Sequence, residues 1–150
     1  MNWTPTAYQA AAARTLPAAL SDRDRLSMLA LGVVGEWGEY AEADLGPESV
    51  AEAGDVLWYI AGLCTVLGVD MTTLGLHNTG IGRDVCALSD ISEPIKKHLY
   101  HGKPLDKARI LRGCARLYMG IVYNHDLPTV MAANVDKLKA RWPDGFRVCA

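Results

Sequence analysis

Apolar and polar positions follow one another along this chain at the three- to four-residue spacing of helices. No segment shows the strict alternation, bounded by hairpin turns, that is typical of strands. Proline, glycine and capping residues divide the chain into segments of helical length. These signals predict six helices and one short additional piece, over residues about 5–19, 22–44, 48–68, 70–78 (the short piece), 82–101, 105–124 and 126–142. The sequence therefore predicts an all-α fold.

Three junctions carry clear helix-boundary signals. Thr4-Pro5 combines a capping residue with a first-turn proline, and Ser21-Asp22 is a second capping pair. Leu45-Gly46-Pro47 interrupts the pattern after the second helix. Because so short a break leaves the next helix beside the previous one, we expect the second and third helices to form an antiparallel hairpin.

The second and third helices differ in the distribution of their apolar residues. The third, over about 48–68, is apolar on all sides and is expected at the centre of the core. The second has one apolar stripe and contains Gly32, Gly35 and Gly38. Each of these glycines costs about 0.8–1 kcal/mol of helix stability relative to alanine. We therefore expect another helix or a ligand close to this backbone.

Composition and charge narrow the class of protein. The chain has 150 residues, 50% apolar and 21% charged, which suits one domain, 1–150, with a sizeable core. Its net charge of −2 excludes a broad cationic surface, so neither nucleic acid nor a membrane is an expected partner. The apolar run at 56–69 is shorter than the ~20 residues of a membrane span. Four cysteines without C-x-x-C spacing, and the lack of a leader pattern, favour the cytoplasm.

Two pairs of acidic residues stand at matched positions on the predicted hairpin. Glu36 and Glu39 are three residues apart on one helix, as are Glu52 and Asp55 on the other, so each pair shares a helical face. At ~1.5 Å per residue, Glu39 and Glu52 lie roughly 10 and 9 Å from the break, and Glu36 and Asp55 roughly 15 and 14 Å. If the faces also match, four carboxylates converge. Such an all-oxygen cluster suits Mg²⁺, with Mn²⁺ as a substitute.

Simpler interpretations of the same acidic residues remain open. Glu39 and Glu42 could be solvated surface charges, and Ser49-x-x-Glu52 fits a capping box that would give Glu52 a structural role. A single glutamate on a helix is usually structural or solvated. Two matched pairs beside a glycine-containing helix and a wholly apolar one favour the metal site instead.

Several segments resemble the MazG-like, all-α nucleoside triphosphate pyrophosphohydrolases. The segments are Gly35-Glu36-Trp37-Gly38-Glu39 and Glu52 to Tyr59, which look like the E-x-x-E … E-x-x-D signature, the opening Tyr8-Gln9 … Arg14-Thr15, and the tail from Asn134 to Phe146. The resemblance implies a helical bundle that hydrolyses a nucleoside triphosphate, with a deoxynucleotide expected, to the monophosphate and pyrophosphate. Nucleotide-pool control or house-cleaning is the implied role, and Mg²⁺ the implied cofactor.

The resemblance also implies roles for individual residues. The metal ligands are Glu36, Glu39, Glu52 and Asp55, and the two catalytic residues are Glu36 and Glu39, with Glu36 the first choice to orient or deprotonate the attacking water. Tyr59 and Trp37 are candidates to stack on the base, although both could be core aromatics, and we favour the core for Trp37. The proposed substrate-binding residues of the tail share one helical face: Asn134, Lys137 and Arg141. Cations near a helix C-terminus can instead serve only the helix dipole.

The chain departs from the family pattern in its length between the acidic motif and the tail. About 55 extra residues lie between Thr73 and Asp126, and we interpret them as part of a tandem repeat, with copies over about 5–78 and 80–146. The second copy has no acidic residue between Asp106 and Asp126, and carries Arg109, Arg112 and Arg116 there. This interpretation predicts a fused pseudo-dimer with one composite site, and a homo-oligomer of such chains. The alternative is that the second copy is only structural.

A second function class also fits the sequence. A degenerate relative of the same fold could bind a nucleotide or another protein without turnover. The intact E-x-x-E and E-x-x-D pairs argue against this alternative, because a decayed site would be expected to lose some of its four acids.

Overall fold

A computed structural model describes residues 2–77 and 83–144, and within them the chain is helical and contains no strand. The elements are α1 (Pro5–Ala13), α2 (Asp22–Glu42), α3 (Pro47–Leu67), the 3₁₀ helix η1 (Met71–Leu76), α4 (Asp84–His101), α5 (Lys107–Asn124) and α6 (Leu127–Arg141). The all-α prediction is confirmed over this part of the chain. Some predicted features lie outside the described residues: the end of the short piece at Asn78-Thr79-Gly80, the helix start at 82, the repeat boundaries at 78, 80 and 146, Phe146 and Cys149.

Side-chain caps start several helices where the sequence predicts them. The Thr4 hydroxyl accepts a hydrogen bond from the Ala7 amide at 3.2 Å, and the Ser21 hydroxyl accepts one from the Asp24 amide at 3.1 Å. The Asp126 carboxylate does the same for the Thr129 amide at 3.2 Å. Each cap pairs a backbone donor that the first helical turn leaves without a partner.

The first helix is shorter than predicted. It ends at Ala13 and not near residue 19, because the chain turns through 14–20. The Thr15 hydroxyl donates a hydrogen bond to the Ala12 carbonyl at 2.8 Å, which caps this end. Pro17 has no amide hydrogen, and its ring disfavours a helical conformation at Leu16. The turn places Thr15 and Pro17 beside α3, where both line the cavity described below.

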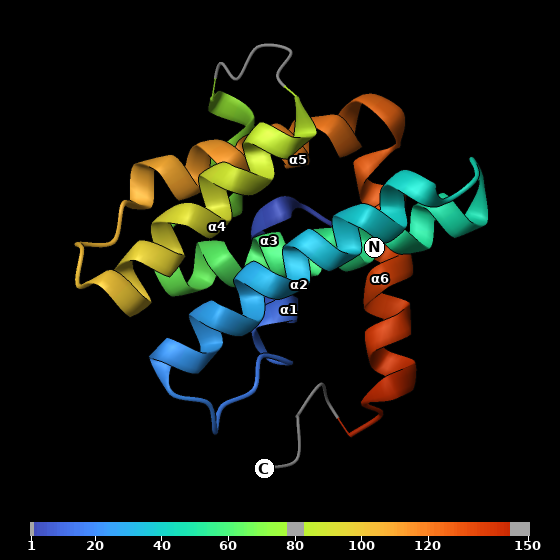
Figure 1. Ribbon diagram of the computed structural model, residues 1–150. Coiled ribbons are helices and arrows are strands. Elements are labelled where there is room, and N and C mark those ends of the chain that lie inside the picture. Colours follow the sequence, from blue (N-terminus) through green and yellow to red (C-terminus); the bar gives the residue numbers. More distant parts are fainter. Residues whose placement is uncertain (1, 78–82, 145–150) are drawn as a thin grey trace.

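Two helical hairpins form the body of the molecule (Figure 1). The α2–α3 hairpin turns at Gly46, whose φ of +125° is a conformation that favours glycine. The α4–α5 hairpin lies against it, with α4 on α2 and α5 on α3. α1 packs on α3, and α6 crosses the hairpin while contacting both α3 and α1. The first and last helices therefore meet on the same side of α3.

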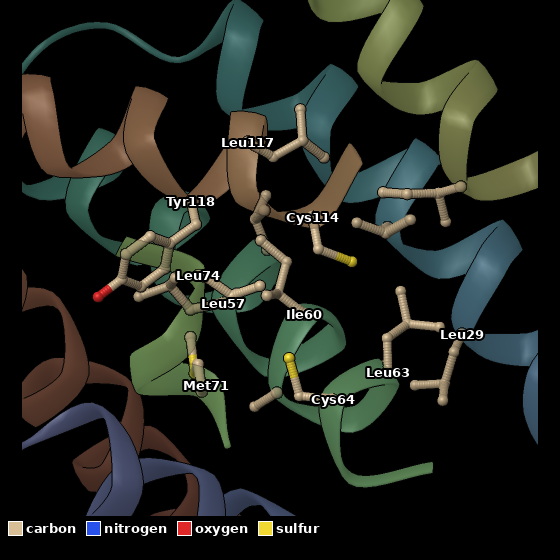
Figure 2. Close-up of a cluster of buried hydrophobic side chains, with 14 of the residues drawn as sticks. Leu29, Leu57, Ile60, Leu63, Cys64, Met71, Leu74, Cys114, Leu117 and Tyr118 are labelled. Atoms are coloured by element: carbon tan, nitrogen blue, oxygen red, sulfur yellow. The ribbon is translucent and has the colours of Figure 1, made fainter. Parts of the chain in front are cut away.

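The centre of the core is α3, as its all-round apolar pattern predicts. By length and composition α3 could cross a membrane, but 56% of its most apolar window is buried against the other helices. Figure 2 shows its side chains Leu57, Ile60 and Cys64 facing α5 and η1. Burial raises the pKa of the Cys64 thiol to about 12, so this cysteine is a core residue and not a reactive one.

The second hairpin carries a salt-bridge network around one buried carboxylate. Asp90 of α4, 6% exposed, accepts hydrogen bonds from Arg109 Nε at 3.0 Å, from Arg112 Nε and Nη2 at 3.0 and 3.1 Å, and from Arg116 Nη1 at 3.5 Å. Hydrogen bonding from Arg112 is the main cause that lowers the pKa of Asp90. The three arginines of α5, which stand where the second copy lacks the acidic motif, thus bind Asp90 of the neighbouring helix α4.

Candidate metal and substrate site

Three glutamates of the first hairpin converge on one place. Carboxylate oxygens of Glu36 and Glu39 on α2 and Glu52 on α3 all lie within 4.8 Å of one another. A register in which Gly32 faces Tyr59 sets Glu36 level with Asp55 and Glu39 level with Glu52. The expectation that the acidic faces match across the hairpin is therefore met for these three residues.

The electrostatic environment of the three glutamates suits a cation. Burial, followed by the negative charges of Asp55, Glu39 and Glu52, raises the pKa of Glu36. Burial, followed by Asp55 and Glu39, also raises the pKa of Glu52. One oxygen of Glu52, Oε2, is buried and has no hydrogen-bond partner among the described residues. A buried acceptor without a partner, inside a cluster of like charges, matches what a hard divalent cation needs.

Asp55 lies beside the cluster and is already bound on both oxygens. Its Oδ1 accepts a hydrogen bond from Asn134 Nδ2 at 3.2 Å, and its Oδ2 forms an ion pair with the Lys137 ammonium. The expectation that all four carboxylates converge therefore needs correction, because Asp55 is shared with α6. The spacing of the acids gave no information on these two partners, which lie 79 and 82 residues away along the chain.

The amide of Asn134 is held from behind by the first helix. Tyr8, which is fully buried, donates its hydroxyl hydrogen to Asn134 Oδ1 at 2.8 Å, and the Gly54 carbonyl lies 3.3 Å from the same hydroxyl. A Cβ on Gly54 would stand 2.9 Å from Asn134 Cβ, so this close approach requires glycine. Residues from α1, α3 and α6 thereby fix the orientation of Asp55.

The capping-box alternative for Glu52 is wrong. The helix α3 begins at Pro47 with Gly46 as its N-cap, so Ser49 lies inside the helix. Ser49 is 3% exposed, and its hydroxyl lies 3.1 Å from His125 Nε2. The Glu52 carboxylate is consequently available to the cluster. Glu42, in contrast, is exposed and does not line the cavity.

The acidic cluster forms one side of an open cavity of about 500 Å³. α6 contributes Asn134, Lys137 and Arg141 to the wall. The remaining wall is mainly apolar and aromatic, with one hydroxyl from Thr15: Thr15, Pro17, Trp58, Tyr59, Leu138 and Trp142. Negative charge, positive charge and aromatic surface therefore line a single cavity of a size typical for small ligands.

Five of these lining residues were not predicted as site residues: Thr15, Pro17, Trp58, Leu138 and Trp142. Trp58 donates its indole hydrogen to the Thr15 hydroxyl at 2.7 Å, which holds the indole on the cavity wall. Its ring meets Tyr59 edge-on, with centroids 4.9 Å apart. The available signals were positional, since Trp58 directly precedes Tyr59 and Trp142 directly follows Arg141.

Tyr59 lines the cavity, whereas Trp37 does not. The Tyr59 ring lies over Gly32, where a Cβ would stand 1.9 Å from a ring carbon. Trp37 is 6% exposed and packs on Tyr40, with ring centroids 5.1 Å apart, and on Gly120. The suggestion that Trp37 stacks on a base is therefore corrected, and its alternative role in the core agrees with this position.

The glycines of α2 do not all have the same cause. Gly32 makes room for Tyr59, as the expected close approach requires. Among residues 2–77 and 83–144, nothing lies within 4 Å of a Cβ built on Gly35 or Gly38, so no neighbouring helix in this part of the chain explains either glycine. The expectation of an approaching helix is wrong for these two positions, and the alternative of an approaching ligand stays a prediction.

Comparison of the chain with known protein families, curated proteins and solved structures finds no match. The chemistry of the cavity is therefore the basis for a functional conclusion. Clustered carboxylates can hold a divalent cation, the two cations of α6 can bind an anion, and the aromatic wall can accept a flat ring.

Proposed function

We propose that this protein is a Mg²⁺-dependent nucleoside triphosphate pyrophosphohydrolase that releases a nucleoside monophosphate and pyrophosphate. The observation that carries the proposal is the cavity itself, which is lined by three clustered glutamates together with cations and aromatic rings. A nucleoside triphosphate is complementary to this lining. Its negatively charged polyphosphate binds metal ions and cations, and its flat base packs against aromatic rings. A deoxynucleotide is the expected substrate, and control of the nucleotide pool the expected role.

The residues present fit a divalent metal ion. Glu36, Glu39 and Glu52 would hold it through carboxylate oxygens, with Asp55 as the fourth candidate. A bound Mg²⁺ neutralises charge on the phosphate oxygens and lowers the pKa of bound water. Mn²⁺ prefers the same ligands and is the expected substitute.

The chain itself supplies positioning and proton transfer in this proposal. Glu36 and Glu39 orient the attacking water, and Glu36 is the first choice to accept its proton, because both side chains lie at the cavity wall. Lys137 and Arg141 bind phosphate oxygens. Tyr59, with Trp58 and Trp142 beside the same space, packs against the base. Phosphoryl chemistry depends mainly on positioning and charge, so no nucleophilic side chain is required.

The MazG-like helical bundle and the tandem repeat belong to the same proposal. The first copy, about 5–78, would include the α2–α3 hairpin, and the second, about 80–146, would include the α4–α5 hairpin and the tail helix α6. In the second copy, Asp90 is bound by arginines, so its carboxylate is not free to take part in an acidic pair like those of the first copy. The site would then be composite, with acids from the first copy and Asn134, Lys137 and Arg141 from the tail. Cytoplasmic location and homo-oligomerisation stay predictions, and light scattering measures the second.

The direct test is to incubate the protein with Mg²⁺ and a panel of ribo- and deoxynucleoside triphosphates. Chromatography of the products is expected to show a monophosphate and pyrophosphate, with no release of inorganic phosphate. Chelation with EDTA should stop the reaction. Binding of a nucleotide by calorimetry without turnover of any of them would favour the alternative, a non-catalytic nucleotide-binding or protein-interaction module.

Replacing single carboxylates tests the assignment of the site. Glu39→Gln and Asp55→Asn are each expected to reduce pyrophosphate release by at least about 100-fold, because each removes charge that positions the metal and the phosphates. The helical circular dichroism should stay unchanged.

Glu42→Gln is the matched control for this pair. It lies one turn after Glu39 on α2, is exposed and does not line the cavity, so its activity should equal that of the wild type. Normal turnover by Glu39→Gln or Asp55→Asn contradicts the metal-site assignment.

A further inference from the structure

The carboxylates of the site differ in whether their oxygens already have hydrogen-bond or ion-pair partners. In the described part of the chain, one oxygen of Glu52 is buried without a hydrogen-bond partner, whereas both oxygens of Asp55 are bound. A cation that binds only the three glutamates therefore displaces no side-chain partner that the structure describes. A cation that also uses Asp55 must first displace one of its two partners.

The two partners of Asp55 differ in how strongly the surrounding structure restrains their side chains. Asn134 is 3% exposed, packs against Gly54 and accepts the hydroxyl hydrogen of the buried Tyr8. The Lys137 side chain is 50% exposed and sits at the end of a flexible four-carbon chain. Exposed ion pairs are weak because water screens them and because the side chain loses entropy on forming them. Oδ1 is therefore fixed on Asn134, and Oδ2 is the exchangeable oxygen.

The ammonium of Lys137 stands where a divalent cation would compete with it. Its positive charge acts on the glutamates as well as on Asp55, since it opposes the rise in the pKa of both Glu36 and Glu52. Without metal, Lys137 thus supplies a counter-charge to the cluster. With metal, the same charge repels the incoming ion. Lys137 also lines the cavity together with Arg141, four residues further along α6.

We propose that Lys137 is a resident counter-ion of the acidic cluster, which gives up Asp55 Oδ2 to a divalent cation and then binds a phosphate oxygen of the substrate. This inference rests on the proposed function, because it assumes that the cluster holds the metal. It assigns Lys137 two opposite effects: competition with the metal when the site has no nucleotide, and support of binding when nucleotide is present.

The test measures both effects with Lys137→Met. In titration calorimetry with Mn²⁺ alone, the variant is expected to bind the ion about 3- to 10-fold more tightly than the wild type, because a like charge has been removed from beside the ion. In titrations with the four α,β-methylene deoxynucleoside triphosphates at saturating Mn²⁺, the analogue that binds best to the wild type should bind at least about 10-fold more weakly. A residue that only stabilises the fold would weaken both.

Two further variants keep the test specific. Lys139→Met removes an exposed cation of the same helix that does not line the cavity, and should change neither affinity. Lys137→Arg retains the charge and should keep the Mn²⁺ affinity near that of the wild type. Circular dichroism and thermal melting of each variant report whether the fold is preserved.

The outcomes separate this inference from the proposed function. A wild-type protein that binds no Mn²⁺ defeats both. A wild type that binds Mn²⁺, with an unchanged or lower affinity in Lys137→Met, overturns the counter-ion role and leaves the metal site in place. Tighter Mn²⁺ binding with unchanged analogue binding also overturns it, because the transfer of Lys137 to phosphate is part of the proposal.

Discussion

Individual carboxylates of this molecule experience opposite environments. Burial and neighbouring negative charges raise the pKa of Glu36 and Glu52 above the usual value near 4.5. Hydrogen bonds from Arg112 and Arg109 lower the pKa of Asp90 below its usual value near 3.8. The ionised glutamates therefore oppose folding in the absence of metal, whereas the ionised Asp90 supports it.

The pH dependence of stability follows from these directions. As the pH falls through the raised pKa of Glu36 and Glu52, the folded state takes up more protons than the unfolded state, and the metal-free protein gains stability. At lower pH, protonation of Asp90 as the pH falls through its lowered pKa removes stability again. Thermal melts in EDTA across this range should therefore show a maximum on the acidic side of neutral pH.

Glu36→Gln tests this conclusion at one residue. At pH 7.5 in EDTA the variant should be more stable than the wild type by about 0.5–1 kcal/mol, since one repelling charge is gone, and the gain should shrink as the pH falls through the raised pKa of Glu36. Its Mn²⁺ affinity should fall by at least about 10-fold. Glu42→Gln should change neither quantity. A loss of stability in EDTA together with unchanged Mn²⁺ affinity would contradict the assigned role.

At the scale of residues, the spacing of the acids predicted three members of the cluster correctly because 3.6-residue periodicity fixes which side chains share a face. The same periodicity could not predict that Asn134 and Lys137 bind Asp55. Those contacts depend on how α6 crosses α3, which is decided by packing between segments 79 and 82 residues apart. The core position of Trp37 likewise depended on its neighbour Gly120.

At the scale of elements, the helix boundaries also divide into those that local sequence predicts and those that it does not. Caps such as Thr4 and Ser21 act within one turn, so their helix starts could be predicted from local sequence. The early end of α1 depended on Thr15 and Pro17, whose combined effect on the following turn was not anticipated. That turn is also what positions Thr15 to bind the Trp58 indole, so the missed boundary and the missed cavity residue have one cause.

The α2 helix allows a matched comparison of two glycines. Gly32→Ala would place a Cβ 1.9 Å from the Tyr59 ring, so we expect the ring to shift, stability to fall by about 1–3 kcal/mol and nucleotide binding to weaken. The added methyl group of Gly35→Ala would meet no described residue within 4 Å, so this substitution should instead stabilise the helix by up to about 1 kcal/mol.

Chemical denaturation measures the free energy of unfolding of both variants. Nucleotide binding is measured by the quenching of Tyr59 fluorescence by a nucleotide analogue, in a protein in which the other tryptophans and tyrosines have been replaced so that the signal can be assigned to Tyr59. A Gly32→Ala protein with wild-type stability and affinity would show that Tyr59 does not need its observed position. Destabilisation by Gly35→Ala would indicate that this exposed backbone is covered by something outside the single chain.

At the scale of the whole molecule, a bound metal ion should stabilise the folded state by linking helices to one another. Its proposed ligands come from α2 and α3, and Asp55 connects these helices to α6. A ligand that binds only the folded state stabilises by about 2.7 kcal/mol at a concentration of 100 times its dissociation constant. For a chain of this size that corresponds to a rise in melting temperature of about 5–10 °C with Mn²⁺.

The melting experiment is controlled by EDTA and by Glu39→Gln. Chelation should return the melting temperature to its starting value, and Glu39→Gln should show little or no rise. An equal rise in wild type and variant would indicate that Mn²⁺ binds elsewhere.

The hydrogen bond from Tyr8 to Asn134 joins residues 126 positions apart, and so connects the first helix to the last. During synthesis on the ribosome, α1, α2 and α3 emerge long before α6. Until α6 has been synthesised, Asp55 has neither the amide of Asn134 nor the ammonium of Lys137 as a partner. The nascent protein consequently carries a set of uncompensated acids, and the proposed site is complete only once α6 has docked.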